Sequence, residues 1–585
     1  MAGEDSERRH RPVPFWNLAA NPIYRRYLRS RLRPKALIPW MLVVGILAAF
    51  VFLSIWVGFL RSANSDTMLA GRVIFIVMIP IQGMLLMIFG TGAVAAGMML
   101  EGEDGGVEYQ RLTPLSPLAK IVGYLFGLPA REYCLFLVTL PFTILAVIAG
   151  RVPLEGVASV YVAFFTAVVL YHLSGCVAGT VVNRRFAGRM AQMIVVVLYL
   201  VLPQLAKLGF EFFSYLTILP VVKELISDLA VPYADDVFSF FFGDGTRQVS
   251  LFGVDLEALP FALLLQGTLI LTFVVVLYRK WRQPTHHMLG KNFAVCLCLW
   301  IHVLLLGSTV PLIDSGEVFP ADESRAERIA RDMGLRGTRA YLMEIKLRAE
   351  KNPKHAYWLA ASYGVGAFVL SCGLVLIITP SRDEFTKGLR RARKLGRRRV
   401  PFNADGATAL THATLIALIG SAAFAVFACE MFGSRWFTPE VMGDRAPVFS
   451  MDWLRVVPFS QILFVLVFWA VLEWAERRAV LLFGLFLWVV PVLAAMIFVL
   501  ADFYQVAIIL GGISGFPSPF YALAFPIDDH RWWMQSIART FPFTVAAYSI
   551  LVVYLILRLK RSHREVVRRV EQGDAPPPAS REISE

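Results

Sequence analysis

The sequence predicts an all-α fold: a polytopic integral membrane protein of about 12 transmembrane helices, arranged as two six-helix pseudo-repeats. Three observations support this fold class. Hydrophobic residues make up 57% of the 585 residues, and the mean hydropathy is +0.61. Charged residues make up only 17%, whereas soluble proteins have about 25%. The apolar residues also form long runs, and a helix needs about 20 mostly apolar residues to cross a bilayer.

Twelve runs are long and apolar enough to be candidate spans. They lie at 37–60, 73–100, 121–149, 157–182, 190–205, 260–277, 293–313, 356–379, 409–430, 459–474, 480–500 and 541–558. The runs 121–149 and 459–474 are the least regular. The first has Pro129, Arg131 and Glu132 near its start, which is typical of a segment that begins as an interfacial helix. Arg131 and Glu132 point about 100° apart on a helix, so we do not expect them to pair.

Basic residues indicate the orientation of the spans. Residues 1–36 hold nine Lys and Arg, so the first span is predicted to be an uncleaved anchor with its basic flank in the cytoplasm. With that start, the predicted cytoplasmic segments hold 36 Lys and Arg in 140 residues, and the outer segments hold 20 in 181. We therefore expect both termini in the cytoplasm. Every span after 293–313 would reverse if that run did not cross.

The order of spans and loops predicts four regions. They are a cytoplasmic amphipathic segment at 1–36, a first six-span half at 37–290, a second six-span half at 291–560 and a disordered cytoplasmic tail at 561–585. Each half has a long outer segment with a broken apolar stretch, at 212–222 and 506–525. Repeated halves of this kind place a transport pathway between them. Any alternation of short inner and long outer loops would look similar.

Residues 21–33 predict an amphipathic helix at the inner membrane surface. Ile23, Tyr27 and Leu28 share one face, and the other face holds Arg25, Arg26, Arg29, Arg31 and Arg33. Such a helix would rest on membrane lipid, with its arginines at the phosphates. The alternative is a basic anchor that forms no separate helix. The net charge of +14 does not indicate nucleic-acid binding, because the basic residues are spread over the membrane flanks.

The loop after the second span, 101–117, is acidic. Its first 11 residues contain one arginine and four acids, Glu101, Glu103, Asp104 and Glu108. Anionic lipid attracts basic segments and not acidic ones, so we expect this loop to contact a protein. The alternative is a loop that is only solvated.

Glycine and proline give this loop a predicted shape. Gly105-Gly106 permits a tight turn out of the span. Thr113-Pro114 and Ser116-Pro117 each offer a capping side chain followed by a proline suited to the first helical position, so a new helix is expected there.

The loop resembles the one between the second and third helices of ATP-binding-cassette transporter permeases of the type-2 exporter class. Their pattern is roughly Glu-Arg-Glu-x-Gly-Thr-Leu-Glu, four residues, then Ser/Thr-Pro-Leu-Ser. This sequence departs from the pattern at Gly102 and Gly106 and matches it at Glu101, Glu103, Gly105, Glu108, Thr113, Pro114, Leu115 and Ser116. The Asn21-Pro22 start of the arginine-rich segment is also similar to this family. In the second half, residues 381–399 take the corresponding place but are strongly basic.

The resemblance implies the permease subunit of an ATP-driven exporter in the bacterial inner membrane. A separate cytoplasmic ATP-binding-cassette ATPase subunit would dock on the residues Glu101, Glu103, Asp104, Gly105, Gly106, Glu108, Thr113 and Pro114. ATP would bind to that partner, since this chain has no Gly-x4-Gly-Lys-Ser/Thr loop, and no cofactor is expected in the chain itself. The pathway would lie between spans 1, 2 and 5 of each half. A homodimer of this chain is also compatible with the resemblance.

Two other classes of function stay open. A membrane-embedded enzyme that acts on a lipid-linked substrate would need clustered polar residues at one membrane face, for which only 206–258 and 501–540 have room. An ion-coupled secondary carrier would need carboxylates near the middle of the membrane, and the sequence places none convincingly there. The sequence contains no His-Glu-x-x-His and no Gly-x-Ser-x-Gly motif, so we predict no catalytic residue.

The remaining polar groups predict no metal site. The six cysteines lie in or beside apolar runs without zinc-site spacing. Asp528-Asp529-His530 and His286-His287 are expected to be solvated or capping groups. His172 and His302 lie inside spans, where a neutral histidine bonded to a neighbouring helix is expected. Glu473 lies near the inner end of a span and is expected either to snorkel to the membrane surface or to pair with a basic neighbour.

Overall fold

The structure is a computed structural model of the chain. It describes residues 14, 16–61, 66–181, 187–207, 211–229, 231, 248–315, 354–397, 399–433, 451–475, 478–485, 489–501, 503, 506 and 531–572. The chain divides into two compact units, Met1–His286 and His287–Glu585. This division lies close to the boundary between residues 290 and 291 that the order of spans predicts.

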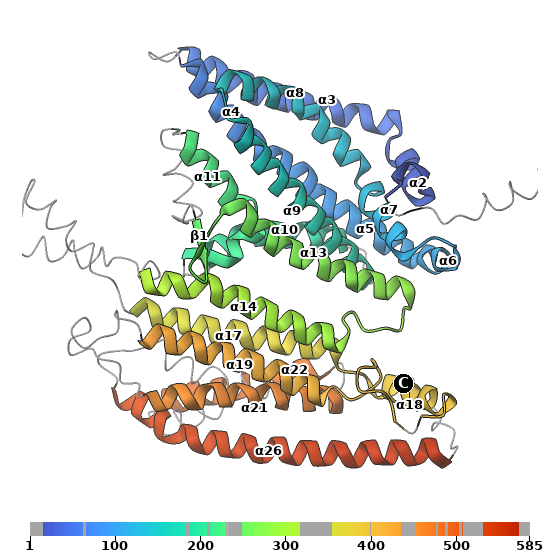
Figure 1. Cartoon of the computed structure of the whole chain (residues 1–585), viewed down its shortest axis with the longest axis vertical. Helices are drawn as coiled ribbons and strands as arrows, with labels where there is room; N and C mark the ends of the chain where they lie inside the picture. Colours follow the sequence, from blue (N-terminus) through green and yellow to red (C-terminus); the bar gives the residue numbers. More distant parts are fainter. Residues whose placement is uncertain are drawn as a thin grey trace, which may run out of the picture. The chain divides into compact units, whose positions relative to one another are not determined.

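Unit 1 is a bundle of long helices with one β-hairpin (Figure 1). Its elements are η1 (Leu18–Ala20), α2 (Pro22–Arg31), α3 (Pro34–Arg61), α4 (Thr67–Gly83), the π-helical η2 (Met84–Gly90), α5 (Thr91–Glu103), α6 (Gly106–Leu112), α7 (Pro117–Gly127), α8 (Ala130–Gly150), α9 (Leu154–Val181), α10 (Ala187–Lys207), η3 (Glu211–Leu216), α11 (Leu219–Leu229), β1 (Gln248–Leu251), β2 (Val254–Glu257) and α13 (Ala258–Arg282). The strands β1 and β2 pair antiparallel.

Helix α9 lies at the centre of unit 1. It packs against α5, α10, α11 and α13, while α3 and α4 pack against α8. Helix α3 lies at the edge of the unit, where only Val44 and Ala48 are buried among its residues. Most of its apolar surface is therefore available to lipid, as expected of a membrane-spanning helix.

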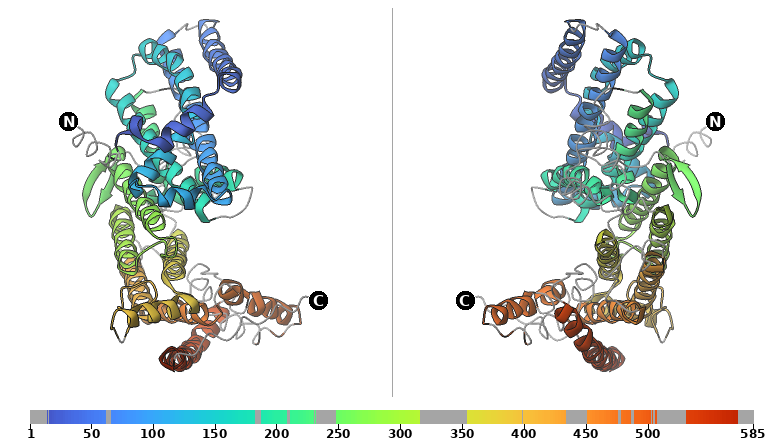
Figure 2. Two further views of the ribbon diagram at one scale, coloured as in Figure 1. Left: turned by 90° about the vertical axis from the view of Figure 1, so that its right-hand side faces the viewer. Right: turned by 90° about the vertical axis from the view of Figure 1, so that its left-hand side faces the viewer.

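Unit 2 is a second bundle of helices (Figure 2). Its elements are α14 (Lys291–Ser315), α17 (Lys354–Ile378), α18 (Arg382–Lys394), α19 (Leu410–Gly433), α21 (Met451–Ala475), α22 (Ala479–Gly484), α23 (Val490–Leu500) and α26 (Arg531–Gln572). Helix α19 packs against α14, α17 and α21, and α21 packs against α26. Helix α18 turns away from the end of α17 by 50°, so it leaves the direction of the bundle.

The described residues contain eight helices that are long and apolar enough to cross a membrane, or nine if the bent pair α17–α18 counts as one span. This is the helix content of a polytopic membrane protein. The predicted spans 190–205, 480–500 and 541–558 coincide with α10, with α22 and α23, and with α26, none of which is among the eight. The predicted span 121–149 is broken at Leu128-Pro129 into α7 and α8, so its interfacial start is a separate helix.

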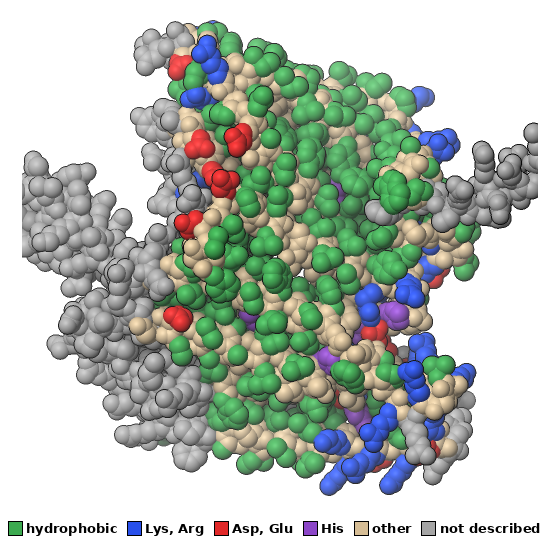
Figure 3. Space-filling model, viewed as in Figure 1, with side chains coloured by type: hydrophobic (Ala, Val, Ile, Leu, Met, Phe, Trp, Pro, Cys, Tyr) green, Lys and Arg blue, Asp and Glu red, His purple; other side chains and the backbone are tan. Residues whose placement is uncertain are grey.

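One boundary differs from the sequence-based expectation. Helix α26 stays helical to Gln572, so residues 561–572 do not belong to the disordered tail that was expected at 561–585. Residues 573–585 and the stretch 507–530 lie outside the described residues. In unit 2, Lys and Arg side chains gather at the end of the bundle where α18 lies, whereas in unit 1 they lie at both ends; apolar side chains cover the sides of the helices (Figure 3).

Candidate functional site

A glycine turn connects α5 to the short helix α6. Gly105 has a φ of 70°, a left-handed conformation that glycine adopts without strain. At Gly106 a Cβ atom would collide with the carboxylate of Glu101. The tight turn expected from this pair of glycines is therefore present, and the backbone conformation of Gly105 favours glycine.

The exposed side of this turn carries both acidic and apolar side chains. Glu103, Asp104 and Glu108 are exposed. Tyr109 and Leu112 are also exposed, at 68% and 86% of their surface. Aromatic side chains are enriched at protein contact surfaces, whose rims are polar. We call these five residues the acidic turn.

Glu101 faces inward, unlike the other acids of the predicted coupling loop. It is only 7% exposed, and it accepts a hydrogen bond from the Tyr27 hydroxyl group. Its carboxylate also lies 2.9 Å from Nη2 of Arg26. Burial raises the pKa of Tyr27, and the hydrogen bond to Glu101 raises it further, so the phenol stays protonated as the donor. Glu101 therefore connects α2 to the end of α5 and is not part of the exposed acidic surface.

Helix α2 rests on protein along its inner face. Asn21 caps it by accepting hydrogen bonds from backbone N–H groups, and Pro22 occupies its first position, as both residues favour. Ile23 and Tyr27 are buried against the small residues of α7, so these two side chains are not available to lipid. The arginines point outward: Arg25, Arg26, Arg29 and Arg33 are exposed, and Arg31 is half-buried.

Polar contacts attach α6, which carries part of the acidic turn, to the neighbouring helix α13. Arg111 contacts Glu108 within α6 and donates a hydrogen bond of 3.3 Å to the carbonyl of Lys280 at the end of α13. Ser116 caps α7 by accepting a hydrogen bond from the Ala119 N–H group. The prediction for Thr113 is wrong, because it ends α6 and donates to the carbonyl of Gln110, so Thr113-Pro114 starts no helix.

Close backbone contacts hold α5 between two neighbouring helices. A Cβ atom at Gly175 of α9 would lie 2.9 Å from the Thr91 carbonyl oxygen, and one at Gly179 would lie 2.7 Å from Cβ of Met98. On the α10 side, a Cβ at Gly188 would lie 2.9 Å from Cβ of Ala96. Small residues at such spacing let membrane helices approach closely. The helix that carries the acidic turn is therefore tightly packed.

An apolar cavity of about 420 Å³ lies further along the same span. It is lined by α4 and η2 on one side and by α10, Ile218 and α11 on the other, with Pro80, Met84, Met87 and Tyr199 among its residues. The Tyr199 hydroxyl group contacts the Met87 sulfur at 3.1 Å. The cavity is the place between spans 2 and 5 of the first half where an apolar molecule would fit.

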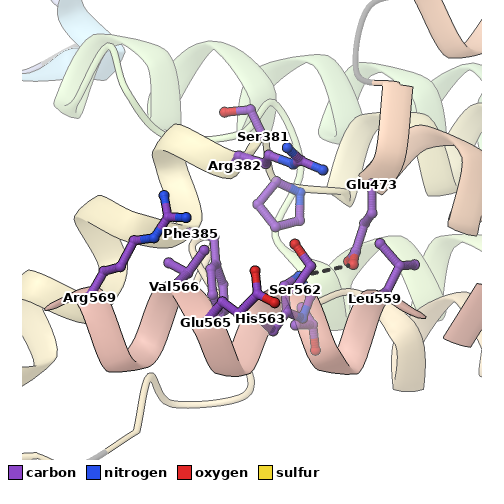
Figure 4. Close-up of a pocket in the computed structure, with 12 residues that line it drawn as sticks. Ser381, Arg382, Phe385, Glu473, Leu559, Ser562, His563, Glu565, Val566 and Arg569 are labelled. Atoms are coloured by element: carbon purple, nitrogen blue, oxygen red, sulfur yellow. Dashed lines mark ion pairs between the residues drawn. The ribbon is translucent and has the colours of Figure 1, made fainter. Parts of the chain in front are cut away.

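Unit 2 has a polar cavity of about 150 Å³ at its basic end (Figure 4). It lies between α18, the end of α21 and α26. Nε2 of His563 on α26 lies 3.4 Å from Oε2 of Glu473 on α21. A basic side chain therefore lies beside Glu473, which is one of the two arrangements expected for it, and the contact is an ion pair when His563 is protonated. The two residues lie far apart in the sequence, so no local pattern predicts this contact.

Other intramembrane groups are occupied by structural contacts. Nε2 of His172 lies 2.9 Å from the Leu86 carbonyl, which confirms the expected bond to a neighbouring helix. The same expectation is wrong for His302, which makes no hydrogen bond among the described residues; its ring instead packs against that of Tyr363, with centroids 6.3 Å apart. The expectation for Arg131 and Glu132 is wrong: Nη2 of Arg131 lies 2.6 Å from Oε1 of Glu132, because the long arginine side chain folds back in the first turn of α8.

The described ranges contain no group of three or more His, Cys, Asp or Glu residues placed to hold a metal ion. The predicted Asp528-Asp529-His530 group lies outside them. No family model matches the chain, and no curated protein or solved structure shows a significant similarity to it.

Proposed function

We propose that this chain is the permease subunit of an ATP-driven exporter, with about 12 spans in two six-helix halves, and that a separate ATPase subunit docks on the acidic turn. One observation carries the proposal. The end of α5, the glycine turn and the short helix α6 together carry three exposed acids and two exposed large apolar residues, and solvation alone gives no reason for Tyr109 and Leu112.

The packing of α5 supports a coupling role for this turn. The helix is continuous with η2 and α4 as one apolar stretch, Thr67–Glu103, and the glycines of α9 and α10 contact it closely. A displacement of the docked turn would therefore move α5 together with its neighbours. The π-helical segment η2 lines the apolar cavity, and π-helical turns within membrane helices are often found at functional sites. ATP-driven closure of the partner would thus reach the cavity through one span.

The cavity supports an apolar or lipid-like substrate, because pockets recognise such molecules mainly through apolar lining residues.

In unit 2, the segment that corresponds to the acidic turn is α18, which is basic. The described residues therefore offer one acidic docking surface. An ATPase dimer would meet two different surfaces on one chain. With the basic flanks inside, as in a bacterial inner membrane, the acidic turn would face the cytoplasm.

The proposal is tested by purifying the chain from membranes of cells that produce it naturally. We expect Mg-ATP hydrolysis, and a polypeptide labelled by a photoreactive ATP analogue, to copurify with the wild-type chain. The double variant Glu103→Lys/Glu108→Lys should lose both, because charge reversal opposes the contact with a complementary partner. An enzyme acting on lipid-linked substrates, or an ion-coupled carrier, would need no bound ATPase.

Glu155→Lys is the matched control. Glu155 is an exposed acid at the start of α9, the end that the predicted topology places outside, and its reversal should leave the ATPase bound. The docking role is refuted if the wild-type chain brings no ATPase, or if the acidic-turn variant and the control retain it equally.

A further inference from the structure

A basic groove of about 630 Å³ lies at the end of unit 2. It is formed by α18, the linker that follows it, the first turn of α19 and the C-terminal part of α26. Its apolar side chains include Leu389, Phe402 and Val567. Phe402 is 63% exposed, so an apolar surface remains open at the groove.

Three arginines line this groove from two directions. Arg399 comes from the linker, and Arg564 and Arg568 come from successive turns of α26. All three are exposed. Within the described ranges none of them makes an ion pair. Glu571 also lines the groove, but its carboxylate lies 2.8 Å from Nη2 of Arg393, so it does not neutralise the three.

Contacts between α18, the linker, α14 and α26 fix the walls of the groove. Arg393 of α18 donates a hydrogen bond of 2.9 Å to the Val570 carbonyl of α26. The Phe385 and His563 rings stack with centroids 4.6 Å apart. Lys291 of α14 binds the carbonyl groups of Ala407 and Thr408. The arginines are therefore presented by a preformed site, which lowers the entropy cost of binding.

The position of the groove along α26 indicates the class of ligand that it binds. The apolar part of α26 ends at Leu557, and Arg558 begins a basic stretch with six Lys and Arg up to Arg569. At 1.5 Å per residue, Arg564 lies about 9 Å beyond Arg558 along the helix, which places it at the outer edge of the headgroup layer, about 5–8 Å thick on each side of the bilayer. A concave site there, with arginines and exposed apolar side chains, matches a molecule with a phosphate and acyl chains.

We propose that this groove binds the phosphate headgroup of an anionic membrane lipid, which the guanidinium groups of Arg399, Arg564 and Arg568 recognise. Arginine binds phosphate oxygens through paired N–H donors. Clusters of Lys and Arg next to a membrane helix are typical of such lipid binding. The bound lipid would join α18 to α26 across the groove. This site is independent of the acidic turn and of the proposed ATPase.

The test uses the full chain in detergent, with lipid binding measured by native mass spectrometry. Dioleoyl phosphatidylglycerol should bind the wild-type chain, and dioleoyl phosphatidylcholine should bind far more weakly. Arg564→Gln/Arg568→Gln should weaken phosphatidylglycerol binding by roughly 25-fold, at about fivefold per arginine. Lys560→Gln/Arg561→Gln removes the same charge from side chains that do not line the groove, and should change it by less than about twofold.

One further variant and two competitors complete the lipid-binding test. Arg399→Gln lies in a linker and should weaken binding by about fivefold even if the double variant in α26 fails to fold. Inorganic phosphate or a polyglutamate peptide, added at the lipid concentration, should not displace phosphatidylglycerol. The proposal is overturned if either competitor displaces it, if phosphatidylcholine binds equally well, or if the groove variants lose no more affinity than the control pair.

Discussion

Glu101 and Glu103 are two residues apart but act on different surfaces. Glu101 lies on the inner side of α5, where it contacts Tyr27 and Arg26, whereas Glu103 is exposed at the end of the helix. A buried carboxylate needs such partners, because its desolvation is otherwise unfavourable. Glu101 is thus an internal connection for α2, and only the residues beyond it are free to meet a partner.

Replacement of Glu101 tests this connection. Glu101→Ala should destabilise the attachment of α2 by about 1–3 kcal/mol, since it leaves the Tyr27 hydroxyl group buried without an acceptor. Limited trypsin digestion should then cut at Arg25, Arg26 and Arg29 faster than in the wild type. Glu103→Ala is the control and should not change the cleavage rate; equal rates in the two variants would show that Glu101 does not hold α2.

Glu384 should make the attachment of α18 sensitive to acid. A hydrogen bond of 3.2 Å with His287 and bonds with Ser381 lower the pKa of Glu384 to about 2, although burial opposes this shift. The folded pKa lies below the ordinary value of 4.5, so the contact stabilises the fold above pH 4.5 and is lost as the pH falls toward 2. Asp405 also faces His287, through a bond with its backbone N–H group.

The measurement compares the Tm of the wild type and of Glu384→Gln. At pH 6 the variant should melt at a lower temperature. The gap should shrink between pH 4.5 and pH 3, because the Glu384 carboxylate takes up a proton in the unfolded wild-type chain while it stays ionised in the folded one. Asp383→Asn, at the exposed neighbouring residue, should show no such trend. A gap that is constant from pH 6 to pH 3 would contradict the assignment.

At the scale of elements, the packing of α5 against α9 depends on glycine. Gly179→Ala should lower the stability by about 1–3 kcal/mol, because the added methyl group would overlap Cβ of Met98. Gly267→Ala in α13 is the control, since a Cβ there meets nothing within 4 Å. Thermal unfolding in detergent should show the loss for the first variant alone; equal melting of both variants would exclude a tight α5–α9 contact.

The sequence predicts individual helices better than their breaks and contacts. Eight of the predicted spans match helices long enough to cross, because a run of apolar residues specifies a membrane helix locally. The inward position of Glu101 and the pair of Glu473 with His563 depend on residues far apart in the chain, so no local pattern shows them. Similarly, Thr113 and Ser116 look alike as capping residues, and packing decides that only Ser116 starts a helix.

At the scale of the whole molecule, the charges predict that both ends of the chain lie in the cytoplasm. The run 293–313, on which this depends in the second half, is part of α14, one of the eight helices long enough to span. Epitope tags at residues 1 and 585 should therefore both resist protease added to intact spheroplasts and both be digested after lysis. Digestion of one tag alone before lysis would mean an odd number of spans.

The central claim is that the acidic turn of α6 contacts an ATPase, and photo-crosslinking tests it most directly. A photoreactive phenylalanine analogue is placed at position 109, or at position 252 in the turn of the β-hairpin, where Phe252 is similarly exposed. The account predicts that position 109 crosslinks in native membranes to a polypeptide that binds ATP, and that position 252 does not. Crosslinks from position 109 to lipid alone, or the same ATP-binding polypeptide from both positions, would contradict it.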